Sequence, residues 1–449
     1  MPAIITDTLR SQIARDFFDQ FANNEAIYYV AIGKSDQWDS NDIVPTPSNN
    51  PSEIKNLKDA MQSIKKIQAV SQVVPRNNWS SGTIYSQYDD LQAGYPSPPY
   101  YVRTENAGVY ICLETGRNAN GVAVPSTVEP TSVNNQSFRT ADGYVWKFLY
   151  TISAINRSNF QSSNFMPVQK QGDIDSNSTG IQLKQKSIQD AAIAGQILNI
   201  VITNAGTGYN SNPTVRITDA LGDSAEAIAI IDSATGTLAR IRMTDSASTI
   251  KHGSGYTSPV ISFVGGTPTD SATARAVVSP DPGIGSDARV DLKSTGIMFH
   301  ADIIGNDSNF IVEQDFRQVS LYKDPKDRLG AAFTVNTGNA LKKMTLASVV
   351  TSFTKDKIIV GQDTEAQAYI DNIDSNEIYY HQTSTTGFKL FNDNEVITEV
   401  NGAGEGVTDS ARILPEVDTA TGSILYIDNR APVLRSNSQD EDIKIIIQF

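Results

Sequence analysis

The sequence predicts a mainly β (α+β), multi-domain protein with antiparallel, β-sandwich-like modules and a few helices near the N-terminus. Three observations lead to this prediction: one segment with strictly alternating aromatic residues, two copies of a glycine-punctuated strand unit, and many short strand-like runs separated by Asn, Asp and Gly. At 449 residues the chain is long enough for about three domains, each with its own core.

The clearest strand signal is RTADGYVWKFLYTI (139–152), in which Tyr144, Trp146, Phe148 and Tyr150 occupy every second position. A period of two is typical of a β-strand with one buried face. Such a row can be a ligand-stacking platform, the inner face of a large sheet or a subunit interface. Because large aromatic side chains mostly supply core or interface area, we favour a core or interface role.

Two helices are expected in the N-terminal part of the chain. The first covers 7–21, where apolar residues recur at helical spacing and Thr6 or Asp7 can cap the start. Its apolar stripe consists of Leu9, Ile13, Phe17 and Phe21. The second is expected over 54–67 as an amphipathic helix whose lysines lie on the solvated face. These lysines are Lys55, Lys58, Lys65 and Lys66. Between the two helices, AIYYVAIG is expected to form a strand that ends in a turn at Gly33.

The middle of the chain contains an internal repeat. Residues 197–231 and 238–278 each have an alternating strand, a G-[TS]-G-Y turn, a strand after a proline and an Ala-rich strand. Two copies are too few for a solenoid, so we expect one compact β module with internal pseudo-symmetry. A further all-β module is expected over 331–418, and the alternating run at 443–449 is expected to be held in a sheet.

Composition limits the possible functions and partners. The formal net charge of −14 and pI of about 4.7 disfavour broad electrostatic binding to nucleic acid. The sequence has no apolar run of the roughly 20 residues needed to span a bilayer and no signal peptide, so we expect no membrane partner and synthesis in a cytoplasm. Cys112, the one cysteine, lies in an apolar strand-like run and is expected to be a buried small hydrophobe.

No catalytic or metal-binding motif stands out. His252, His300 and His381 lie far apart without a ligand spacing, so we expect loop or surface histidines and no metal site. The glycine-rich stretches lack the Gly-Lys-Ser/Thr ending of a P-loop, and there is no G-x-S-x-G elbow. We therefore expect no enzymatic activity, no catalytic residues and no cofactor.

Five segments, in order along the chain, resemble the baseplate wedge subunit of T-even-type contractile-tailed bacteriophages, the gene product eight family. These segments are IYYVAIGKSDQWDSND, VVPRNNW, ADGYVWKFLYTI, DFRQVSLYKDP and ILYIDNRAPVLRS…EDIKIIIQF. The resemblance covers roughly 1–170, 290–326 and 419–449. The motif residues with expected structural or interface roles are Trp38, Arg76, Trp79, Tyr144, Trp146, Phe316, Arg317, Asn429, Arg430 and Phe449.

The resemblance implies a wedge core made of 1–190, 283–330 and 419–449. This core is interrupted by an inserted two-copy β-repeat module at 191–282 and a second inserted small β module at 331–418. It also implies a homodimer without enzymatic activity that binds other wedge proteins in the tail baseplate of the virion. Such a subunit would be assembled in the host cytoplasm and would take part in baseplate rearrangement when the sheath contracts.

Two other functions stay open at this stage. A receptor- or carbohydrate-binding tail protein would use the two β modules as binding units and would need surface aromatic residues there. Residues 197–278 offer only Tyr209, Tyr256 and Phe263 for this purpose. A tail-associated hydrolase acting on cell-wall or capsule sugar would need a pair of carboxylates in a cleft.

Overall fold

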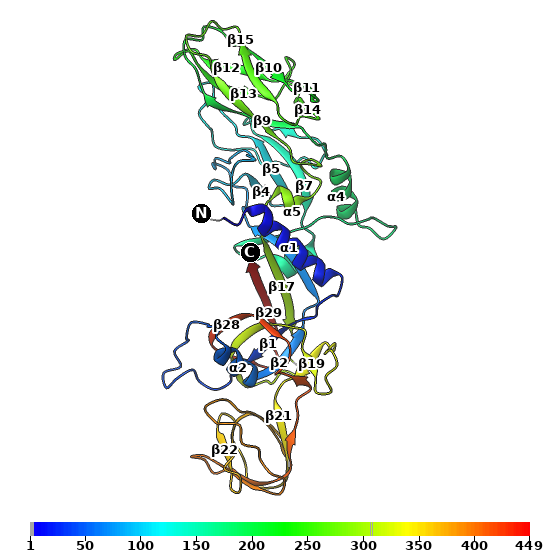
Figure 1. Ribbon diagram of the computed structural model, residues 1–449, viewed down its shortest axis with the longest axis vertical. Helices are drawn as coiled ribbons and strands as arrows, with labels where there is room; N and C mark the ends of the chain where they lie inside the picture. The colour runs from blue at the N-terminus through cyan, green and yellow to red at the C-terminus, as the bar shows by residue number, and fades with distance from the viewer. Residues whose placement is uncertain (1–3, 306, 308) are drawn as a thin grey trace. The chain divides into compact units, whose positions relative to one another are not determined.

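A computed structural model describes residues 4–305, 307 and 309–449 of the chain (Figure 1). Strands account for 40% of the residues and helices for 11%, so the predicted mainly β, multi-domain fold is confirmed. The chain forms two compact units. Unit 1 comprises the residues up to Asp16, Ser71–Met298 and Ile447–Phe449, and unit 2 comprises Phe17–Val70 and Phe299–Ile446. The helices are α1 (Asp7–Ala22), α2 (Pro51–Asp59), α3 (Ala154–Phe160), α4 (Gly180–Asp190) and α5 (Ala288–Asp291).

Unit 2 contains an antiparallel sheet and a closed β-barrel. The strand order of the sheet is β20 (Thr337–Asn339), β2 (Met61–Lys66), β1 (Tyr28–Gly33), β18 (Asp315–Lys323) and β28 (Ser423–Leu434). The strand order of the barrel is β21 (Lys342–Thr351), β24 (Glu377–His381), β23 (Gln367–Asp374), β22 (Ile358–Gly361), β25 (Val396–Glu399) and β26 (Glu405–Ile413). A short pair, β19 (Lys326–Asp327) and β27 (Val417–Asp418), completes the strands between Lys326 and Asp418. Apolar residues such as Met344, Ile370 and Ile378 fill the barrel.

Unit 1 contains the sheet that holds the aromatic strand. Its order is β4 (Tyr101–Arg103), β5 (Gly108–Glu114), β7 (Val145–Thr151) and β6 (Phe138–Arg139). The strands β29 (Glu441–Gln448), β17 (Gly296–Ile303), β3 (Ala69–Pro75) and β8 (Phe165–Val168) are also neighbours in that order. The alternating run at 443–449 thus forms part of a sheet strand, as its pattern predicts.

The repeat forms one sheet of unit 1, drawn mainly in green in Figure 1. Its strand order is β13 (Thr237–Arg242), β12 (Ile228–Asp232), β10 (Thr214–Thr218), β15 (Val260–Val264), β16 (Thr273–Val278) and β9 (Ile197–Asn204), and β11 (Asp223–Ala225) pairs with β14 (His252–Ser254). The equivalent strands β10 and β15 pair at the centre, and the first strand of each copy pairs with the last strand of the other. This order is that of a pseudo-two-fold axis between β10 and β15.

The two tyrosines of the repeat turns lock the copies together. The Tyr209 hydroxyl accepts a hydrogen bond from Ala272 N at 2.9 Å, and the Tyr256 hydroxyl accepts one from Ala225 N at 3.1 Å. Each tyrosine is buried, and each bonds the copy to which it does not belong. The Tyr256 ring also packs against Gly222, where an added Cβ would lie 2.1 Å from a ring carbon. Each copy therefore completes the core of the other.

The predicted helix over 54–67 is wrong in its second half. Helix α2 is capped by Asn50, has Pro51 at its first turn and ends at Asp59, and the chain then forms strand β2. Pairing of β2 with both β1 and β20 overrides the helical spacing of its apolar residues. As a consequence Lys65 is not on a solvated helix face. Its ammonium is mostly buried and lies 2.9 Å from the Asp307 carboxylate.

The apolar stripe predicted for the first helix is also only partly buried. Helix α1 forms as expected, but Leu9 is 49% exposed and Ile13 is 38% exposed. In this half of the helix the buried side chains are the small ones of Ser11 and Ala14. In the second half Phe17 contacts the aromatic rings of unit 2, with its centroid 5.5 Å from that of Tyr28.

Candidate functional site

Three segments of the family resemblance meet in one sheet of unit 2. Strand β18, from the segment DFRQVSLYKDP, pairs with β1 on one side and with β28 on the other. The register places Gln318 opposite Gly33 and opposite Asn429, although these three positions are hundreds of residues apart in the sequence. The segments that carry the resemblance in unit 2 therefore form one continuous piece of structure.

Trp38 joins the loop after β1 to strand β28. Its indole Nε1 donates a hydrogen bond to the Arg430 carbonyl oxygen at 2.9 Å, and the Lys34 ammonium lies 5.2 Å from the centre of the indole ring. Asn429 makes a second link, because its amide donates to the Pro45 carbonyl oxygen at 3.0 Å and accepts from Gln318 at 2.9 Å. These residues thus have structural roles between the segments.

Arg317 on β18 binds the same loop after β1 through Ser35 and Asp42. Its side chain is nearly buried, its Nη2 lies 3.0 Å from Asp42 Oδ2, and it also donates to the Ser35 carbonyl oxygen. The hydrogen bond from Arg317 lowers the pKa of Asp42 below its usual value. Burial opposes the positive charge of Arg317, but the Asp42 carboxylate overrides it and raises the arginine pKa. The adjacent Phe316 is buried in unit 2.

A buried ionic network joins the barrel strands to the loop after β1. His381 on β24 lies 2.7 Å from Asp371 Oδ2 on β23 and 3.5 Å from Asp36 Oδ1. Burial alone would lower the histidine pKa, but the two carboxylates override it and raise it to about 9. Burial likewise opposes ionisation of Asp36, but His381 and Lys34 lower its pKa to about 2. The network therefore holds a histidinium between two carboxylates near neutral pH.

The network does not have the connectivity of a serine nucleophile site. Ser35 Oγ donates to Asp371 Oδ1 at 2.5 Å, so the carboxylate, not His381, contacts the serine. In a catalytic triad the imidazole must lie between the hydroxyl and the carboxylate in order to accept the hydroxyl proton. What this arrangement can do is orient the chain between Lys34 and Asp36 against the barrel.

The remaining motif residues lie in unit 1 and are structural in their contacts. Trp146 is fully buried and stacks on Tyr144, with 5.6 Å between the ring centroids. Trp79 donates from Nε1 to Ser126 Oγ at 3.2 Å, and Arg76 donates to the Ser162 carbonyl oxygen at 2.9 Å. Phe449 N donates to the Thr295 carbonyl oxygen at 3.0 Å. A core role for the aromatic strand is confirmed for Tyr144, Trp146 and Phe148, which share one cluster.

A core role also holds for Tyr150, but the expectation of a strand with one buried face is wrong. Tyr150 is buried but belongs to a second cluster with Val145 and Leu149, so the aromatic row is divided between two cores. The pairing of β7 with β5 shifts register between Val109 and Tyr110, which changes the alternation along β7. Both faces of the strand are buried, because one core cluster packs on each of them.

The expectation of loop or surface histidines is wrong. His252, His300 and His381 are all buried and lie in strands β14, β17 and β24. His252 Nδ1 lies 2.8 Å from the Ile197 carbonyl oxygen, and burial lowers the His252 pKa to about 4. No local pattern indicates these placements, because the partners of His300 and His381 come partly from distant strands or loops.

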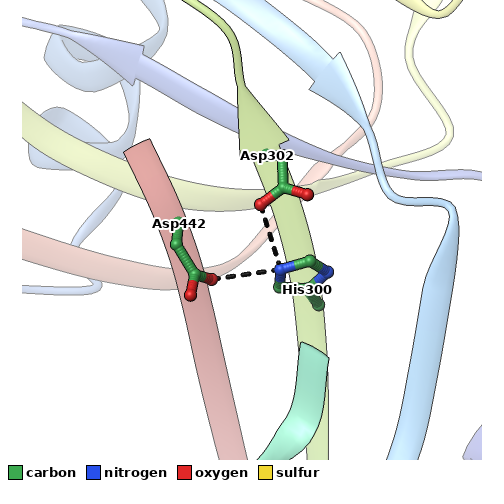
Figure 2. A group of neighbouring side chains, drawn as sticks. All are labelled: His300, Asp302 and Asp442. Carbon is green, nitrogen blue, oxygen red and sulfur yellow. Dashed lines mark ion pairs between the residues drawn. The ribbon is translucent and has the colours of Figure 1, made fainter. Parts of the chain in front are cut away.

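Figure 2 shows the group around His300, in which two aspartates converge on one imidazole nitrogen. His300 Nε2 lies 3.2 Å from Asp302 Oδ1, two residues along β17, and 3.0 Å from Asp442 Oδ1 on the neighbouring β29. Separations near 3 Å are those of adjacent ligands on a metal with bonds of about 2.1 Å, so the donor set suits a divalent cation such as Zn²⁺.

The same distances are those of an ion pair with a protonated imidazole. Both aspartates are more than half exposed, and the Lys444 ammonium already lies 2.5 Å from the other carboxylate oxygen of Asp442. Within the described residues, no second observation supports a bound cation at His300, Asp302 and Asp442. The proposed function does not depend on a metal ion at this group.

No protein-family model matches the chain, and no curated protein matches it. In the described part of the chain, none of the helices has the length and apolar character needed to cross a membrane.

Proposed function

We propose that this protein is a structural subunit of the baseplate wedge of a contractile phage tail. In this proposal it links neighbouring wedge subunits as a homodimer, without catalysis, and takes part in the rearrangement of the baseplate when the sheath contracts. Its place is the virion, after assembly in the host cytoplasm. The proposal starts from the five resembling segments, whose order along the chain is that of the family.

The observation that carries the proposal is the meeting of β1, β18 and β28 in one sheet. Three resembling segments that lie far apart along the chain pair as direct neighbours. A chance resemblance of short segments would not be expected to select strands that pair with each other. The contacts of Trp38, Arg317 and Asn429 within this sheet and its loop favour a rigid framework.

Two measurements test the proposal. Immunogold labelling of purified tails with an antibody against this chain should place several copies at the baseplate. Sedimentation equilibrium of the purified protein should give a dimer, twice the chain mass of 48.7 kDa. Label at fibre tips, or absence of label on intact and contracted tails, would contradict the wedge proposal. A monomer at all accessible concentrations would contradict the homodimer alone.

One observation favours the alternative of a carbohydrate-binding tail protein. A cavity of about 340 Å³ in unit 2 is lined by Trp38 together with amide and hydroxyl side chains such as Asn50, Asn56 and Ser384. An aromatic ring beside amides is a common arrangement for sugar binding. However, the Lys34 ammonium lies over the Trp38 ring, and the tyrosines of the repeat, Tyr209 and Tyr256, are buried. Binding to a glycan array that is lost in Trp38→Ala would favour this alternative.

A further inference from the structure

A cavity of about 240 Å³ in unit 1 gathers arginines in a strongly acidic protein. Strand β13 of the repeat module contributes Arg240 and Arg242, and the loop after β5 contributes Arg117. Arg139 lies beside the cavity, where it binds Glu114. The formal net charge of the chain is −14, so a local excess of positive charge is not a consequence of composition.

The protein neutralises the positive charge of the cavity only in part. Glu114 is the one carboxylate among its described lining residues, and it is already taken by Arg139 through two hydrogen bonds of 3.1 and 2.9 Å. Within the described residues, Arg117, Arg240 and Arg242 have no carboxylate partner. The guanidinium groups of Arg240 and Arg242 are close enough to act on each other, and this repulsion is a cost that a bound anion would remove. The Arg117 side chain is exposed at the rim of the cavity and donates to the Gly121 carbonyl oxygen at 2.8 Å.

Arg240 is the central member of the group. Its Nη1 donates to the Arg117 carbonyl oxygen, but its Nε is buried and has no hydrogen-bond partner among the described residues. Burial, together with the neighbouring charges of Arg242 and Arg139, lowers the pKa of Arg240, and the Glu114 carboxylate opposes this change without reversing it. A buried N–H without a partner is uncommon in folded proteins and requires an explanation.

The backbone brings these arginines together through a bulge and a glycine. The pairing of β12 with β13 places Ile230 opposite Arg240 and Ile231 opposite Leu238, so Ala239 is an extra residue in β13. Such a bulge redirects side chains and is common beside functional sites. Gly121 has φ +78° and lies against the bulge, where a Cβ would be 2.1 Å from the Ala239 carbonyl oxygen. Only a glycine allows the Arg117 loop to approach β13 this closely.

We propose that this cavity binds a tetrahedral oxyanion of the phosphate class, either free phosphate or the phosphoryl group of a small molecule. Guanidinium groups form paired hydrogen bonds with such oxygens, and Arg242, which has no side-chain hydrogen bond or ion pair within the described residues, is free to contribute one. The cavity volume of about 240 Å³ is far above the ~10–15 Å³ that one water molecule requires, so a phosphate group with attached atoms has room. This inference is independent of the wedge proposal.

The first experiment is calorimetric titration of the full chain with inorganic phosphate in a chloride buffer at constant ionic strength. We expect saturable binding by the wild type and binding at least about tenfold weaker in Arg240→Gln and in Arg242→Gln. Arg216→Gln is the matched control, because Arg216 is an exposed arginine on β10 of the same module. It should bind phosphate as the wild type does.

Arg240 donates a hydrogen bond to the Arg117 loop, so Arg240→Gln can also destabilise the fold. If that variant is unfolded, Arg242→Gln alone tests the phosphate site. Saturable phosphate binding that is unchanged in a folded Arg242→Gln or Arg240→Gln protein would overturn the proposal, and so would the absence of phosphate binding by the wild type. An equal loss in Arg216→Gln would also overturn it, because binding would then reflect general surface charge.

A second titration distinguishes the two sources of the anion. Glucose 1-phosphate is compared with inorganic phosphate, and glucose serves as the uncharged control. Tighter binding of glucose 1-phosphate would support a phosphoryl group carried by a small molecule, whereas tighter or equal binding of inorganic phosphate would support the free ion. Equal binding of glucose itself would contradict an oxyanion site.

Discussion

His381 Nδ1 lies 2.7 Å from Asp371 Oδ2, and both side chains are shielded from solvent. The pair belongs to neighbouring strands of the barrel, while Asp36, the second carboxylate near the imidazole, follows strand β1. A histidinium between two carboxylates thus connects the barrel to the sheet that contains the resembling segments.

Removal of the imidazole should destabilise unit 2. His381→Ala leaves the buried Asp371 carboxylate without its cation, and we expect a loss of about 3–5 kcal/mol in the free energy of unfolding. Chemical denaturation followed by far-UV circular dichroism measures this loss. The double variant His381→Gln/Asp371→Asn should recover part of the stability, because it removes the buried charge as well. A loss below about 1 kcal/mol in His381→Ala would show that the pair is solvated.

The same network predicts a pH dependence of stability. The folded-state pKa of His381 is about 9, above the ordinary value of 6.5, so its stabilisation is fully present below pH 6.5 and is lost as pH rises through 9. The folded-state pKa of Asp36 is about 2, below the ordinary 3.8, so its stabilisation is present above pH 3.8 and is lost as pH falls through 2. Melting temperatures of the wild type and His381→Gln should therefore converge on the alkaline side. Parallel curves up to high pH would contradict the assignment.

Trp146 offers a test of the core in unit 1. Trp146→Ala creates a large cavity and should cost about 3–5 kcal/mol of unfolding free energy. Trp146→Phe should cost clearly less, because the buried indole N–H has no hydrogen-bond partner among the described residues and its removal loses no bond. Thermal unfolding of the two variants makes the comparison. An unchanged melting temperature for Trp146→Ala would rule out the burial.

The pseudo-symmetric tyrosines should make equal contributions. Tyr209→Phe and Tyr256→Phe each leave one backbone N–H, of Ala272 or Ala225, without its acceptor, and each should cost about 1–3 kcal/mol. Tyr426→Phe on β28 is the control, because the Tyr426 hydroxyl has no hydrogen bond within the described residues. Urea titration of the three variants provides the measurement. A large effect at one turn tyrosine and none at the other would contradict their equivalence.

Cys112 should be unreactive in the folded protein. Its thiol is fully buried, and burial together with the Glu114 carboxylate raises its pKa well above the ordinary value of 9.0. The thiolate is the reactive form, so labelling with a disulfide reagent should require unfolding. One equivalent of label should appear in denaturant, and almost none in native buffer over the same period. Rapid labelling of the native protein would place Cys112 at an accessible position.

The sequence predicted correctly those elements that hydrophobic periodicity and capping residues determine. The strand around Trp146 and the helix beginning at Asp7 form where periodicity and capping place them. The strand β2 was missed because its pairing with β1 and β20 is decided by residues distant in sequence. For the same reason the sequence did not show that His381 meets Asp36, although Asp36 lies inside a resembling segment. The arginine cavity depends on a bulge and a loop contact, which no spacing in the sequence indicates.

The repeat sheet has a consequence for how such a module can be exchanged between proteins. Ile197 and Val278, where the sheet begins and ends, are direct partners in the antiparallel strands β9 and β16. Their Cα atoms are thus only about 5 Å apart, the spacing across a hairpin. Because the two ends of the module are adjacent, it can be inserted at one loop of a recipient chain. The recipient chain before and after the insertion then keeps its own fold. Recombination could add, remove or replace this sheet in related chains, provided that Leu198 and Val277, which pack into the adjoining core, find apolar partners.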